Sequence, residues 1–201
     1  MDTRTRILSE ARELFLQAGL GGFSMRALAE RVGVSATALY RHFEDRDAIL
    51  ASLLDEAFRT FGGTLMQALA GETPFERLRL TGKAYFEFAL AHPRDYELMF
   101  MTNCVDLGLM RMSEELEQRA QSTFVFLVDR VSECMEAGVL RRDEPRTVAV
   151  YIWTQVHGLA SLWLVGQLSK DLDEAGFHQL CEFTLDQLEL ALCSREQPAR
   201  R

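Results

Sequence analysis

The chain contains the stretch Ser24-Met-Arg-Ala-Leu-Ala-Glu-Arg-Val-Gly-Val-Ser-Ala-Thr-Ala-Leu-Tyr-Arg-His-Phe43, which decides the fold expected for its N-terminal part. Two short helices that cross steeply through a tight turn need a small side chain at the crossing and a glycine in the turn. Ala29 and Gly33 meet these two needs. Leu39 and Phe43 are spaced i, i+4 and therefore share one apolar face of the second helix. The stretch predicts a helix-turn-helix.

The same stretch leaves polar side chains on the outside of the second predicted helix, namely Thr37, Tyr40 and Arg41. Ser24 and Ser35 stand where a side-chain oxygen can cap the start of each helix, and an exposed helix N-terminus also binds phosphate. The alternative is an ordinary helical hairpin, in which the glycine is only a helix cap and the outer side chains are solvated. The combined spacing favours double-stranded DNA as the partner.

The first fifty or so residues resemble the N-terminal domain of the TetR family of bacterial transcription regulators. The residues that carry the resemblance are Arg6-Ile7-Leu8, Ala11, Leu14-Phe15, Gly19, Ser24-Met25-Arg26, Leu28-Ala29, Gly33-Val34-Ser35, Leu39-Tyr40-Arg41-His42-Phe43 and Ile49-Leu50. The resemblance implies an all-helical homodimer that binds a palindromic operator, while a larger C-terminal domain binds a small molecule and the partner subunit. Ligand binding usually releases the DNA in this family, which implies a repressor.

Carried over by position, the resemblance implies two kinds of DNA contact. The implied phosphate contacts are Ser24, Ser35, Tyr40, His42 and Arg46, and the implied base-facing positions are Arg26, Ala36, Thr37 and Ala38. Arg46 departs from the lysine that the family commonly has there, and its neighbours are acidic. We interpret Asp45 as the cap of the next helix and Asp47 as a first-turn carboxylate, in preference to a metal site.

The second predicted helix offers few groups that can read bases. Ala36 and Ala38 have no hydrogen-bonding side chain and contribute only methyl contacts to thymine. We therefore expect sequence specificity to rest on Arg26, Thr37 and Arg41 and on DNA shape.

Composition excludes several classes of protein. With 201 residues, 48% of them hydrophobic, the chain can bury a core without disulfides or metal. The net charge of -8 lies beyond residue 50, because the first fifty residues hold seven arginines and seven acidic residues. The charged start is followed by no apolar signal segment, and no apolar run has the length of a membrane span. We expect a cytoplasmic protein without membrane contact.

Motifs of catalysis and cofactor binding are lacking. The four histidines are scattered, and the sequence has no HExxH motif and no glycine-rich phosphate loop. The four cysteines form no CxxC pair, and we interpret them as buried thiols, with a redox sensor as the alternative. We expect no catalytic residue, no metal site and no cofactor, and thus no enzyme.

Helix-start signals divide the rest of the chain. Thr73-Pro74-Phe75-Glu76 is a capping box, and His92-Pro93 and Glu144-Pro145 each place proline in a first helical turn. Ser113-Glu114-Glu115 and Asp171-Leu172-Asp173-Glu174 mark two further starts. We predict an all-α fold of about nine helices. A three-helix helix-turn-helix domain spans residues 1–45, and a six-helix ligand-binding and dimerisation domain spans residues 46–201, its first helix being the connector.

Ala91-His92-Pro93 with Tyr96, Met99 and Phe100, and later Trp153 with Val156-His157-Gly158-Leu159, resemble the C-terminal domain called WHG in one branch of the TetR family. The residues expected to contact a ligand are Phe86, Tyr96, Met99, Phe100, Phe124, Trp153 and His157. Aromatic and thioether groups suit an adaptable cavity, and no basic residue is evident for a buried anion, so we expect an apolar or aromatic effector. His157 is either its polar anchor or a buried neutral imidazole. The alternative function is a DNA-binding regulator with no small-molecule effector.

The last two predicted helices, over about residues 145–168 and 171–193, are apolar around more than one stripe. A second apolar face must be buried elsewhere, and the same helices of a second chain would complete a four-helix bundle around a two-fold axis. The alternative is a larger core within one chain. We expect a homodimer through these helices, because a reader of a palindrome needs two heads about one DNA turn apart.

Overall fold

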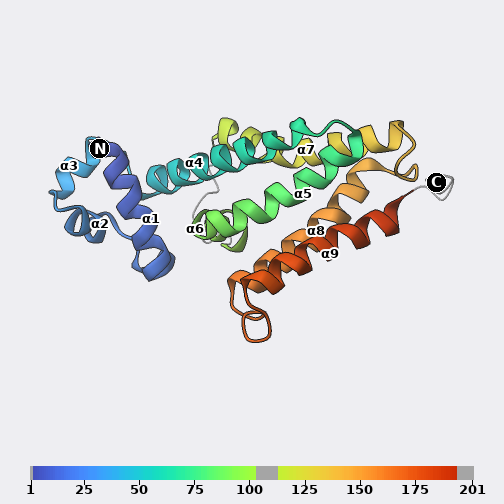
Figure 1. The fold of residues 1–201 in the computed structure, drawn as a ribbon. Coiled ribbons are helices and arrows are strands. Elements are labelled where there is room, and N and C mark those ends of the chain that lie inside the picture. The colour runs from blue at the N-terminus through green and yellow to red at the C-terminus, as the bar shows by residue number, and fades with distance from the viewer. Residues whose placement is uncertain (1, 103–112, 194–201) are drawn as a thin grey trace. The chain divides into compact units, whose positions relative to one another are not determined.

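The structure is a computed structural model that describes residues 2–102 and 113–193. Within these ranges it is helical and has no strand beyond one isolated bridge between Leu140 and Cys193. Figure 1 shows the helices α1 (Thr3–Gly22), α2 (Met25–Val32), α3 (Ala36–Tyr40), α4 (Arg46–Met66), α5 (Pro74–Ala91), α6 (Pro93–Tyr96), α7 (Glu114–Glu136), α8 (Pro145–Leu164) and α9 (Glu174–Leu192). A 3-10 turn spans Gln67–Ala70 and a π-helical turn spans Glu97–Met101. The predicted all-α fold is confirmed.

The predicted start signals begin the helices of the C-terminal part. The Thr73 hydroxyl accepts from the Glu76 N–H at 3.1 Å, and the Glu76 carboxylate accepts from the Thr73 N–H at 3.0 Å, so the capping box is present. Glu144 caps α8 ahead of its proline, and Asp173 caps α9. The Ser113 hydroxyl accepts from a backbone N–H in the first turn of α7 at 3.2 Å.

Contacts divide the chain into two compact units. The first unit consists of Met1–Arg59 and Arg94–Ala120, and the second unit consists of Thr60–Pro93 and Gln121–Arg201. Helices α4 and α7 therefore each run from one unit into the other. The segment after Pro93 groups with the N-terminal helices, although it is far from them in the sequence. The division into domains 1–45 and 46–201 stays a prediction.

The core of the first unit gathers apolar residues from α1, α2, α3 and the start of α4, and two crossed ion pairs fasten α6 to α1. Its buried members include Ile7, Leu8, Phe15, Phe23, Leu28, Leu39, Phe43, Ile49 and Leu50. Arg12 of α1 lies 2.7 Å from Asp95 of α6 and 3.3 Å from Glu56 of α4. Arg94 of α6 pairs in turn with Glu13 of α1. The α6 segment is thus held to the first unit by charge as well as by apolar contact.

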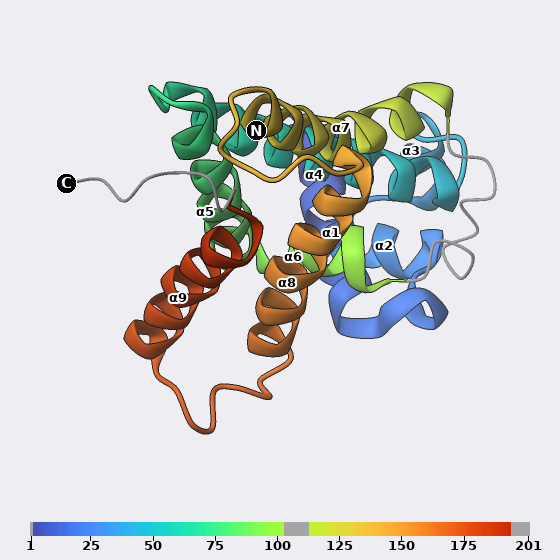
Figure 2. The same cartoon turned by 90° about the vertical axis from the view of Figure 1, so that its right-hand side faces the viewer.

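In the second unit, α5, α8 and α9 pack around aromatic side chains, and Figure 2 shows α8 and α9 side by side. Phe177 of α9 stacks on Trp163 of α8 with ring centroids 4.4 Å apart, and it meets Phe86 of α5 edge-on at 6.3 Å. Ion pairs join the polar sides of α5 and α9, since Lys83 lies 2.7 Å from Glu182. The aromatic contacts fix the distance between the three helices.

The cysteines within the described residues are free thiols. Cys134 and Cys181 are buried free thiols, and burial raises the pKa of each to about 12. Cys193 is half-buried and free, and Cys104 lies outside the described residues. Within residues 2–102 and 113–193, no helix is long and apolar enough to cross a membrane. In the same ranges, no group of three or more His, Cys, Asp or Glu side chains could hold a metal ion.

Candidate nucleic-acid interface and ligand site

A left-handed glycine ends α2 and begins the turn toward α3. Gly33 has φ 74° and ψ 35°, a conformation in which an L side chain is strained. Its N–H donates to the Glu30 carbonyl at 3.2 Å, and the Val34 N–H donates to the Ala29 carbonyl at 3.0 Å, which closes the end of α2. The Ala29 side chain is buried, as the close crossing requires. The predicted turn forms around the two residues that decide it.

Serine hydroxyls cap both helices of this pair. Ser24 accepts from the Ala27 N–H at 3.2 Å, and Ser35 accepts from the Ala38 N–H at 3.2 Å. Both serines are exposed. A hydroxyl that accepts in this way can still donate its own hydrogen to a phosphate oxygen, and the first N–H groups of the helix point the same way. Both helix starts are therefore suited to the DNA backbone.

Helix α3 has one buried side and one exposed side. Leu39 and, just beyond the helix, Phe43 are buried, as their spacing predicts. Thr37, Tyr40 and Arg41 are exposed, and the Tyr40 side chain is 54% exposed. Tyrosine combines a large apolar ring with a hydrogen-bonding tip, and its exposure on a five-residue helix is typical of a contact surface. Of the two alanines in this segment, the first is exposed and the second is half-buried.

The remaining predicted DNA contacts lie on neighbouring segments of the first unit. Arg26 is exposed on α2, and His42 is exposed just after α3. Arg46 opens α4, and its Nε lies 3.2 Å from the Asp47 carboxylate. Asp45 accepts from a backbone N–H of α4 at 2.7 Å, which is the capping role predicted for it. The acidic neighbours thus stabilise the start of α4 while leaving the arginine half-exposed.

Three of the seven predicted ligand residues meet in the second unit. The Trp153 ring lies 5.8 Å from that of Phe124 and 5.6 Å from that of His157, measured between centroids. Tyr85, which the sequence analysis did not assign to the site, joins them. Its phenol oxygen lies 2.9 Å from His157 Nδ1 and accepts from Trp153 Nε1–H at 3.3 Å. Tyr85 lies 68 residues from Trp153 in the sequence, so no local spacing links the two side chains.

The hydrogen bonds of this cluster accommodate a neutral imidazole. An indole N–H can only donate, so the Tyr85 oxygen accepts from Trp153 and can give its own hydrogen to His157 Nδ1. In that arrangement the neutral ring carries its hydrogen on Nε2, which lies 3.4 Å from the Ser161 hydroxyl, and the other tautomer makes the same two contacts with the roles reversed. Burial lowers the pKa of His157 and so favours this neutral form. The cluster combines aromatic rings with two polar groups, which suits an apolar molecule that carries one hydrogen-bonding group.

The other four predicted ligand residues have different surroundings. Phe86 is buried in the second unit against Phe177. Tyr96, Met99 and Phe100 belong to the first unit, where the rings of Tyr96 and Phe100 lie 5.1 Å apart. Tyr96 and Met99 are buried. Phe86, Tyr96 and Met99 are thus buried in the described structure, and their contact with a ligand stays a prediction.

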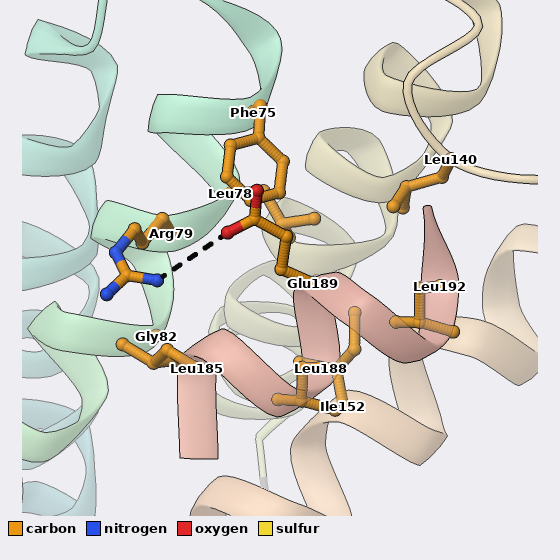
Figure 3. Close-up of a pocket in the computed structure, with 10 residues that line it drawn as sticks. All are labelled: Phe75, Leu78, Arg79, Gly82, Leu140, Ile152, Leu185, Leu188, Glu189 and Leu192. Carbon is orange, nitrogen blue, oxygen red and sulfur yellow. Dashed lines mark ion pairs between the residues drawn. The ribbon is translucent and has the colours of Figure 1, made fainter. Parts of the chain in front are cut away.

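A separate, mainly apolar pocket opens between α5, α8 and α9 in the second unit (Figure 3). It is small, with a cavity volume of about 30 Å³, and it is lined by Phe75, Leu78, Arg79, Gly82, Leu140, Ile152, Leu185, Leu188, Glu189 and Leu192. Its charged lining residues, Arg79 and Glu189, are 4.0 Å apart. Burial alone would lower the pKa of Arg79, but the carboxylates of Asp186 and Glu182 outweigh it and raise that pKa. Arg79 is therefore charged and already paired, and none of the predicted ligand residues lines this pocket.

Two family profiles match the chain. The profile of bacterial regulatory proteins of the tetR family matches residues 7–53. The profile of the tetracyclin repressor-like C-terminal domain matches residues 78–188. The first match contains α2, α3 and the turn between them, and the second contains α6 and the Tyr85–His157 cluster.

Individual proteins are similar over much of the chain. The transcriptional activator FasR of Mycolicibacterium smegmatis is 27% identical over 175 residues, which are 87% of this chain and 78% of that protein. The transcriptional repressor KstR of the same organism is 38% identical over 84 residues, or 41% of each protein. A solved structure of a protein of unknown function from Rhodococcus sp. RHA1 is 25% identical, covers 96% of this chain and 97% of that one, and has a TM-score of 0.77.

Proposed function

Because the chain belongs to the TetR family of transcription regulators, we propose that it is a repressor that binds a palindromic operator as a homodimer and is released by a small, largely apolar effector. A DNA-binding regulator of this family is not an enzyme. We propose a cytoplasmic location, because the protein must reach its operator.

The observation that carries the operator proposal is the exposed side of α3. Tyr40 and Arg41 project from a short helix whose opposite side is anchored in the core, next to two serine-capped helix starts. We assign Ser24, Ser35, Tyr40, His42 and Arg46 to phosphates, and Arg26, Ala36, Thr37, Ala38 and Arg41 to the base edges. Phosphate contacts set the register of the protein on DNA, and only the second group reads sequence.

The dimer proposal is supported by apolar side chains on the outward sides of α8 and α9. Tyr151 and Leu162 of α8 are exposed, as are Val165 just after it and Phe183 and Leu190 of α9. Apolar side chains of this size on two adjacent helices mark an interaction surface. We propose that the same helices of a second copy cover these side chains and thereby hold the two DNA-binding domains at a fixed spacing.

The effector proposal is supported by the cluster of Tyr85, Trp153 and His157. We propose that an apolar molecule binds against these rings and that its one polar group forms a hydrogen bond with the cluster. Release of DNA then requires that the effector bind more tightly to a conformation whose two DNA-binding domains are wrongly spaced for the operator than to the DNA-bound conformation. Helix α4 runs from the first unit into the second, so we propose it as the element that links the two events.

The proposal is tested by selecting bound duplexes from a random pool and repeating the binding with neutral aromatic and aliphatic compounds. We expect an inverted repeat with half-site centres about 10 base pairs apart. We also expect that some compounds release the parent protein from DNA at a lower concentration than they need to release a Tyr85→Phe variant. A Phe75→Leu variant, altered in the separate pocket, is the matched control for this shift.

Two results would contradict separate parts of the proposal. A selected sequence without two-fold symmetry would exclude the homodimer on a palindrome. An operator that none of the compounds releases would favour a regulator without a small-molecule effector.

A further inference from the structure

The guanidinium group of Arg4, in the first turn of α1, joins three segments of the first unit. Its central carbon lies 4.4 Å from the centroid of the Phe43 ring. Its Nη1 lies 3.4 Å from the His42 carbonyl oxygen, and its Nη2 lies 3.4 Å from the Ser52 hydroxyl on α4. In Figure 1 the start of α1 accordingly lies beside the end of α3. One side chain therefore connects α1, the residues that follow α3, and α4.

The end of α3 needs support of this kind. A helix of five residues is not stable by its own hydrogen bonds, and its last carbonyl groups have no partner within the helix. Leu39 and Phe43 anchor one side of the segment in the core. Arg4 adds a cation over the Phe43 ring and a donor to the His42 carbonyl, just beyond the helix end that favours positive charge.

The hydrogen-bond directions agree with this arrangement. Ser52 donates its hydroxyl hydrogen to the Ala48 carbonyl at 2.8 Å. The lone pairs of the same oxygen are then available to accept from Arg4 Nη2. The planar guanidinium can stack on a ring and donate from both ends at once, whereas a lysine ammonium cannot.

We propose that Arg4 is a positioning residue for DNA recognition. It holds His42 and the end of α3 in the orientation from which Tyr40 and Arg41 reach the operator, and it acts from within the protein instead of contacting a phosphate. This inference rests on the proposed reading of DNA by α3. It concerns a residue whose charge and place near the N-terminus would otherwise suggest a phosphate contact.

Operator binding by Arg4→Lys and Arg4→Ala tests the proposal, with Arg6→Lys and Arg6→Ala as the matched pair on an exposed arginine of the same helix. Affinity is measured on the selected operator and on random duplex over a range of salt. Positioning predicts that both Arg4 variants lose about threefold to tenfold in affinity for the operator. Affinity for random duplex and the salt dependence stay near those of the parent. Ser52→Ala removes one acceptor of Arg4 without changing any charge. It should lower the logarithm of operator affinity by about half as much as the Arg4 variants do.

A phosphate contact predicts a different pattern. Arg4→Lys would then bind like the parent, while Arg4→Ala would weaken binding to all sequences alike and lower the salt slope by about 1. That pattern overturns the proposal, and so does unchanged operator binding by both Arg4 variants. A parent protein that selects no duplex sequence would instead contradict the proposed function. Thermal unfolding of each variant separates a loss of fold from a loss of discrimination between operator and random DNA.

Discussion

Arg12 and Asp95 form a partly buried ion pair that ties α6 to α1, and the Arg12 side chain is 26% exposed. The Arg12 Nε atom lies 2.7 Å from the Asp95 Oδ1 atom, and the Asp95 side chain is 11% exposed. Glu56 of α4 places a second carboxylate 3.3 Å from the same guanidinium. Removing one partner of a buried pair leaves the other charge desolvated and uncompensated. The position of the α6 segment within the first unit therefore depends on this pair.

Asp95→Ala is expected to lower the free energy of unfolding by about 2 kcal/mol. This loss is smaller than for a fully buried pair, because Arg12 still pairs with Glu56 and is partly exposed to solvent. Urea unfolding measures it. Arg59→Ala is the matched control, because it removes an exposed i, i+4 pair of α4 that is worth about 0.5 kcal/mol at most. Replacing both partners, as in Arg12→Met with Asp95→Leu, should restore part of the loss. If Asp95→Ala and Arg59→Ala lowered the free energy of unfolding equally, the Arg12–Asp95 pair would stabilise the protein no more than an exposed pair.

His157 makes stability depend on pH in a defined direction. Burial lowers its pKa below the ordinary value of 6.5, so the unfolded chain binds this proton more readily than the folded protein does. The stability that the neutral ring contributes is fully present above about pH 6.5 and is lost as the pH falls through the lowered pKa. The urea midpoint of the parent should therefore fall more between about pH 7.5 and 5.5 than that of His157→Asn, which keeps an acceptor near Tyr85 but does not titrate. Parallel curves for the two proteins would contradict this account.

The helix starts could be predicted from the sequence because each signal acts over a few residues. Thr73, Glu144 and Asp173 each cap a backbone N–H three residues further on, so the information is local. The turn at Gly33 was equally predictable, since only glycine adopts its left-handed conformation without strain. These signals set the order of the helices and the buried side of α3.

The pairings between distant segments could not be predicted in the same way. Tyr85 meets His157 across 72 residues, and Arg4 meets Ser52 across 48 residues, with no periodic pattern linking the partners. Of the predicted ligand residues, Tyr96 is fully buried, and Trp153 and His157 meet Tyr85. An aromatic side chain has the same sequence signature in a core as in a ligand site, so only packing separates the two.

Gly71, which follows the 3-10 turn before α5, leaves no room for a side chain. A Cβ atom there would lie 2.8 Å from the backbone nitrogen of Arg77. Since a backbone atom cannot rotate away, Gly71→Ala should lower the free energy of unfolding by about 1–3 kcal/mol. Gly63→Ala in α4 is the control, because its Cβ meets no described atom within 4 Å, and it should raise stability by about 0.5–1 kcal/mol. Thermal or urea unfolding measures both, and the same sign for both would contradict the packing argument.

Tyr40 and Arg41 are expected to differ in what their loss does to DNA binding. Tyr40→Phe removes one hydroxyl assigned to a phosphate and should weaken all sequences alike, by about fivefold to tenfold. Arg41→Ala should cost about 1–3 kcal/mol on the operator and relax discrimination at one base position. Gel retardation with operator and point-substituted duplexes measures both. Arg142→Ala, on an exposed residue between α7 and α8, is the control and should bind like the parent. Unchanged retardation by both variants would exclude α3 as the reading helix.

The outward side of α9 provides the sharpest test of the dimer. Phe183 is 57% exposed and Leu190 is 75% exposed. Tyr151 and Leu162 of α8 are exposed on one face of that helix, and Val165 follows just after its end. A charge in the centre of such a contact costs about 2–4 kcal/mol, so Phe183→Asp should shift the protein to monomers in sedimentation and weaken operator binding in parallel. Leu69→Asp is the matched control, because Leu69 is 48% exposed on the 3-10 turn, outside the proposed interface, and its variant should remain dimeric. A parent that sediments as a monomer, or a Phe183→Asp protein that stays dimeric, would contradict a dimer built on α8 and α9.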